Sequence, residues 1–103
     1  MFRRARYGSL IDTQLDLFVR DHQDVLADVD ARLRAYNEAG RDEAEELYGD
    51  YVDAVESATE ALADMRDRFR RTLDDDTGER YEEEFNRAVK KRWPALGLEI
   101  DLR

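Results

Sequence analysis

Apolar residues recur along the first part of the chain at the spacing of an α-helix. Between residues 9 and 38 they follow one another in steps of three or four, with one histidine among them, at Ile11, Leu15, Phe18, His22, Val25, Val29, Leu33 and Tyr36. Asp, Gln and Arg occupy most of the intervening positions. This pattern predicts one amphipathic helix over about 9–38, and Gly40 is a residue type that commonly follows a helix end.

A second stripe follows with a regular heptad alternation. It consists of Tyr48, Tyr51, Val55, Ala58, Leu62, Met65 and Phe69. The stripe predicts a helix over about 42–73, and Asp42 with Glu45 has the spacing of a capping box. Such a helix is about 48 Å long at 1.5 Å per residue, so it needs an equally long neighbour. The short link at 39–41 therefore predicts an antiparallel helical hairpin.

The last 30 or so residues contain a third helical pattern, followed by a segment in which apolar and other residues alternate. Asp76 and Glu79 again have capping-box spacing, and a shorter third helix is predicted over about 77–92, before Pro94. In the segment 95–103, Leu96, Leu98, Ile100 and Leu102 alternate with other residues. A period of two indicates an extended C-terminal tail with one apolar face.

Length and composition indicate one all-α domain over 1–103 that associates with itself. The hydrophobic fraction is 42%, but alanine makes up much of it, so large core side chains are scarce. A second copy could complete the core. The sustained heptads fit a coiled-coil-like helical bundle, and we expect a homodimer or a larger homo-oligomer, with another protein as the other candidate partner.

The charge disfavours several classes of partner. The formal net charge is −9, so the chain as a whole repels nucleic acids and anionic membranes.

No stretch has the length and apolarity of a membrane span, and the N-terminus does not have the pattern of a signal peptide. We therefore expect a cytoplasmic protein. The absence of cysteine excludes disulfides and thiol chemistry.

Two groups of arginines should meet at one end of the hairpin. They are Arg3, Arg4 and Arg6 before the first helix, and Arg66, Arg68, Arg70 and Arg71 near the end of the second. We call these seven residues the arginine pole. One interpretation is that bases at a helix end offset the helix dipole. The other is a site for an anionic partner, such as nucleic acid, phosphate or an acidic protein.

His22 lies in the middle of the first apolar stripe. A histidine in this position is most often a packed residue with one bonded nitrogen. It could also fix helix register or sense pH. Direct ligation or catalysis is the third interpretation.

No constellation of residues predicts catalysis, a cofactor or a metal site. Serine occurs at Ser9 and Ser57, far apart, and Val19 stands where a Glu-x-x-His iron motif needs glutamate. The acidic pairs at 43/46 and 64/67 lie roughly 30 Å apart on one helix, too far to share an ion. We expect a non-enzymatic helical module for protein interaction or structure that associates with itself. The alternative is a binding or regulatory protein that uses the arginine pole.

Overall fold

The computed structural model describes residues 6–103, and this part of the chain is all-helical, without strands. Its elements are α1 (Gly8–Asp21), α2 (Gln23–Asn37), α3 (Ala44–Arg70), α4 (Asp75–Arg92), the 3-10 helix η1 (Pro94–Leu96) and α5 (Gly97–Leu102). The all-α class predicted from the sequence is confirmed for these residues. None of these helices combines the length and the apolarity needed to cross a bilayer.

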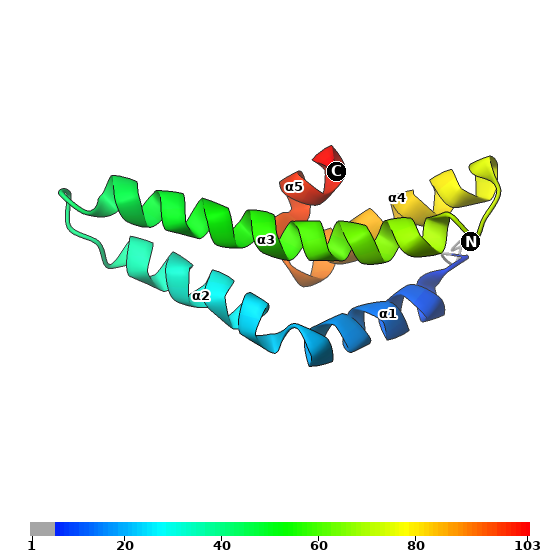
Figure 1. Ribbon diagram of the computed structural model, residues 1–103, viewed down its shortest axis with the longest axis horizontal. Coiled ribbons are helices and arrows are strands. Elements are labelled where there is room, and N and C mark those ends of the chain that lie inside the picture. Colours follow the sequence, from blue (N-terminus) through cyan, green and yellow to red (C-terminus); the bar gives the residue numbers. More distant parts are fainter. Residues whose placement is uncertain (1–5) are drawn as a thin grey trace, which may run out of the picture.

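The single first helix predicted over 9–38 is wrong, because the chain breaks at His22. This residue has φ −127° and ψ 34°, outside the helical region. The helix on either side has a different neighbour: α1 contacts α4, whereas α2 lies along α3 (Figure 1). The break leaves the period of three and four intact, since His22 N–H still bonds the Phe18 carbonyl at 2.8 Å. One apolar stripe therefore serves two packing partners.

Two of the predicted helix starts also differ from the structure. The capping box of Asp42 and Glu45 does not form, because α3 begins at Ala44 without a side-chain cap. The next helix, α4, begins at Asp75 rather than near residue 77. Its cap is Asp74, whose carboxylate accepts a 2.8 Å hydrogen bond from Thr77 N–H. Hydrogen bonds from Thr77 lower the pKa of Asp74.

The extended tail predicted for 95–103 is wrong as well, since the segment forms η1 and α5. The four alternating apolar residues split into two pairs spaced by four. Leu96 and Ile100 point inward and are 1% and 0% exposed, whereas Leu98 and Leu102 point outward and are 82% and 80% exposed. Such spacing puts each pair on its own face of a helix, so α5 buries one face against α3 and α4.

The buried side chains gather at one end and in the middle of the 50 × 31 × 24 Å molecule. There α4, η1 and α5 pack on α3 and α1 packs on α4. We call this part, residues 6–29 and 54–103, the body. Beyond it the second half of α2 and the first half of α3 continue side by side, and none of the other described helices lies across them (Figure 1). We call residues 30–53 the arm, and the turn between its helices the tip.

Candidate functional site

The arm is a pair of helices whose apolar seam stays partly open to solvent. None of the residues 30–53 is buried. The half-buried large apolar side chains along the seam are Leu33, Tyr36, Leu47, Tyr51 and Val52. Two helices alone cannot enclose a core, because each side chain between them still faces water on the third side. The arm thus presents an incompletely buried apolar surface.

The heptad stripe of α3 shows the change from body to arm most directly. Leu62, Val55 and Tyr48 occupy the same position in three successive heptads. Their exposed fractions are 0%, 6% and 51%. The side chains stay apolar or aromatic, but the cover is lost, because α4 and α5 lie over the middle and the C-terminal half of α3 (Figure 1). The same face is core in one half of the helix and surface in the other.

Aromatic rings form the end of this surface. The Tyr48 ring lies 5.2 Å from that of Tyr36 and 6.4 Å from that of Tyr51, between ring centroids. Beyond them the tip is acidic. Over 38–46 the chain carries one basic residue, Arg41, and the acidic residues Glu38, Asp42, Glu43, Glu45 and Glu46. An aromatic patch bordered by carboxylates suits an apolar partner surface that carries positive charge.

Part of the arginine pole is engaged within the chain. Arg3 and Arg4 lie outside the described residues, whereas Arg6 lies over the Tyr7 ring at 5.6 Å. Arg68 and Arg71 are exposed. Arg70 donates to Glu82 at 2.7 Å. Three further acidic residues, at positions 74–76, begin α4 at the same end of the molecule. The surface there is of mixed charge, and part of its positive charge is already paired.

Arg66 belongs to the core rather than to a surface. Its side chain is completely buried, and the guanidinium donates to Asp67 at 2.8 Å, Asn86 at 2.9 Å and the Ile100 carbonyl at 3.2 Å. It thus ties together α3, α4 and α5. The sequence contained a signal for this position, because Arg66 follows Leu62 by four residues and so lies on the apolar stripe.

His22 packs at the break between α1 and α2. Its ring stacks on Phe18, with centroids 4.3 Å apart and planes 15° apart, and Nδ1 lies 3.3 Å from the Phe18 carbonyl oxygen. The side chain is half-buried. These contacts are those of a packed residue, and they explain how an irregular backbone is held in place.

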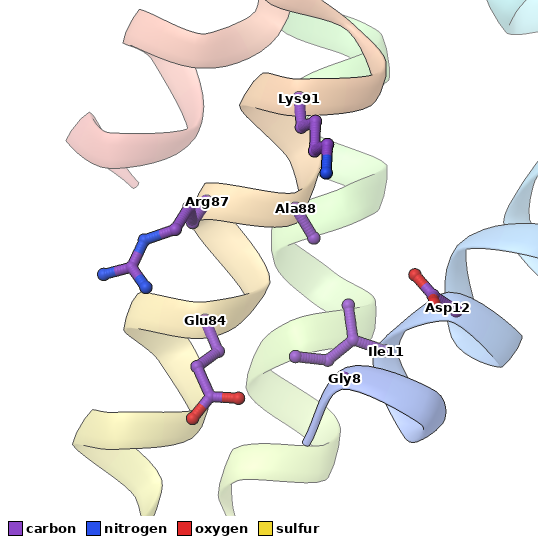
Figure 2. A pocket seen from close by; sticks show the side chains of 7 residues that line it. All are labelled: Gly8, Ile11, Asp12, Glu84, Arg87, Ala88 and Lys91. Carbon is purple, nitrogen blue, oxygen red and sulfur yellow. The ribbon is translucent and has the colours of Figure 1, made fainter. Parts of the chain in front are cut away.

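A cavity of about 200 Å³ lies between the start of α1 and α4 (Figure 2). Ile11 and Ala88 contribute apolar surface, and the charged lining residues are Asp12, Glu84, Arg87 and Lys91. The Glu84 carboxylate is already bound within the chain, since it accepts a 2.8 Å hydrogen bond from Tyr7 N–H. Neither histidine nor serine lines the cavity. The charged side chains around it are of mixed sign.

Among residues 6–103 no group of three or more His, Asp or Glu side chains is arranged to hold a metal ion. In comparisons with known proteins, no family model, curated protein or solved structure matches this chain.

Proposed function

We propose that this protein is a non-enzymatic helical interaction module that associates with itself through the arm. The observation that carries the proposal is the heptad stripe of α3, which is buried at Leu62 and half exposed at Tyr48. Burying apolar surface is the dominant favourable contribution to most protein association. A second arm laid on the first would supply the missing cover and form a four-helix bundle.

The alternative function, recognition of an anionic partner by the arginine pole, has less support. Recognition of nucleic acid or phosphate needs several arginines free on one surface. Here Arg66 is buried, Arg70 is paired with Glu82, and acidic residues adjoin the exposed Arg68 and Arg71. The uncovered apolar stripe therefore favours self-association.

The test is the molar mass in solution by light scattering, over a concentration series at low and at high salt. One chain has a mass of 12.1 kDa, and we expect twice that value or more at both salt concentrations. A mass of 12.1 kDa throughout the series would overturn the proposal.

A pair of matched variants locates the interface. Tyr48→Glu puts a charge at the centre of the proposed interface, so this variant should be a monomer. Leu17→Glu is the control, because Leu17 is 41% exposed on α1, outside the arm. It should keep the wild-type mass. Dissociation by the control alone would place the interface on α1.

A further inference from the structure

A second cavity lies at the foot of the arm, where α4 ends. Its volume is about 220 Å³. Leu26 and Val29 of α2 line one side, and Trp93, Pro94 and Leu96 line the other. The helices α4, η1 and α5, which pack on α3, form a third layer of the body beside α3 and the first two helices. The cavity opens where this third layer ends and the uncovered face of the arm begins. We call it the foot cavity.

The foot cavity has the size and chemistry to take one aromatic side chain. An apolar protein cavity of roughly 150 Å³ accommodates benzene. Most of the lining is apolar, and Asp30 adds an exposed carboxylate. Arg92 also lines the cavity and is held by a 2.8 Å ion pair with Asp16. A phenol could place its ring among the apolar groups and donate its hydroxyl proton to Asp30.

The arm carries an exposed aromatic side chain that could fill such a cavity. Tyr48 is 51% exposed, and its ring is flanked by the rings of Tyr36 and Tyr51. These neighbours restrict the ring, so little conformational freedom is lost when it enters a partner. Tyr48 does not line the foot cavity of its own chain. Arg32 pairs with Asp50, which places Val29 about level with Asp53, so Tyr48 lies roughly 8 Å nearer the tip.

The charges favour an antiparallel arrangement of two arms. The tip is acidic, so two tips placed together would repel each other. The last turns of α4, which lead to the foot cavity, carry no acidic residue over 87–92 and four basic ones. Lys90 pairs with Asp101 and Arg92 with Asp16, which leaves Arg87 and Lys91 to provide positive charge for a partner. An antiparallel pair brings the acidic tip of each copy onto these basic turns of the other. Such a pair is closed and two-fold symmetric.

We propose that Tyr48 of one copy enters the foot cavity of a second copy, and that the second copy does the same in return. The inference rests on the proposed self-association and gives it a geometry. The two-fold axis then passes near Tyr51, halfway between Tyr48 and the level of Val29. The acidic tip of each copy then lies beside the last turns of α4 of the other copy, and each arm covers the open face of the other.

Cross-linking between two different single-cysteine variants tests this geometry, because the natural chain has no cysteine. Ala44→Cys places a thiol one helical turn from Tyr48, and Ala95→Cys places one in the foot cavity lining. Both substitutions are small and leave Tyr48 in place. When the two variants are mixed and treated with a short bismaleimide, we expect a 44–95 cross-linked dimer. Leu17→Cys mixed with Ala95→Cys is the control and should give little product.

The outcomes separate the two proposals. A dimer by light scattering with the 44–95 product supports both. A dimer in which Ala44→Cys alone cross-links to itself, without a 44–95 product, overturns the docking of Tyr48 but leaves self-association standing. A monomer by light scattering overturns both. Tyr48→Ala adds a quantitative readout, because loss of a central aromatic residue should raise the dimer dissociation constant about 30-fold.

Discussion

The arm and the body use similar residues with opposite results. In the body, the Tyr81 ring packs against Phe69 at 4.8 Å, Tyr7 at 5.7 Å and Phe85 at 5.9 Å, and Tyr81 is completely buried. In the arm, Tyr48 has two aromatic neighbours at similar distances and is half exposed. The difference is the third layer. Burial here depends on how many helices surround a position, and less on the residue at that position.

The largest expected effect contrasts the two regions at one heptad position. Leu62→Ala leaves a cavity in the body and should lower the free energy of unfolding by about 4 kcal/mol. Tyr48→Ala should lower it by less than about 1 kcal/mol in dilute solution, where the arm is unpartnered. Urea unfolding at low protein concentration measures both. Equal losses would mean that the arm is as well packed as the body, contrary to the exposed fractions.

The periodicity of apolar residues predicts α3 and α4 as helices, although not their first residues, because the backbone of each stays helical along the whole stripe. It could not predict the break at His22, since the steps between Phe18, His22 and Val25 are those of a continuous helix. The kink arises from tertiary packing, in which α1 follows α4 and α2 follows α3.

The predicted extended tail is wrong because alternation over eight residues fits both the two-residue period of a strand and the four-residue spacing of a helix face. Leu96 and Ile100 are spaced for a helix face as well as for one side of a strand. The helical conformation is stabilised by packing on α3 and α4. The Arg66 guanidinium also donates a hydrogen bond to the Ile100 carbonyl. The apolar surface of the arm is only partly predictable from the sequence, through the spacing of Tyr36, Tyr48 and Tyr51. Its exposure depends on where α4 and α5 end, which the stripe of α3 does not encode.

The next effect concerns the buried charge that holds the body together. Arg66→Met keeps an unbranched side chain in the core but removes the donor to the Asn86 side-chain oxygen and one of the two donors to the Ile100 carbonyl, which should cost about 2 kcal/mol. Amide hydrogen exchange in α5 should accelerate more than exchange in the arm. Arg68→Met is the control, because Arg68 is exposed and should have little effect. Unchanged protection of α5 would show that its apolar contacts suffice.

A smaller effect is expected at the boundary between α1 and α2. His22→Ala removes the ring stacked on Phe18 and should cost about 1 kcal/mol, measured by thermal or urea unfolding. Gln23→Ala, at the exposed neighbouring position, should be close to neutral. A molar mass that changes between about pH 5 and 8 in the natural chain, but not in His22→Ala, would instead support pH sensing by this residue.

The smallest effect appears only in alkaline solution and distinguishes the buried tyrosine of the body from the rest of the chain. Burial raises the pKa of Tyr81 from 10.0 to about 12, although its hydroxyl bonds Gln14 at 2.7 Å. Between these two values the unfolded chain loses the proton while the folded chain keeps it. The stability contributed by Tyr81 is therefore complete below pH 10 and is lost as the pH rises through 12.

Phenolate absorbance follows this titration directly. In the folded protein, one of the five tyrosines should ionise with a pKa of about 12. That late step should disappear in Tyr81→Phe and in denaturant, where burial no longer raises the pKa. Tyr48→Phe is the matched control and should keep the late step, because Tyr81 remains enclosed by the third layer. If Tyr48→Phe removed it instead, the enclosed ring would lie in the arm, and the contrast between arm and body would be reversed.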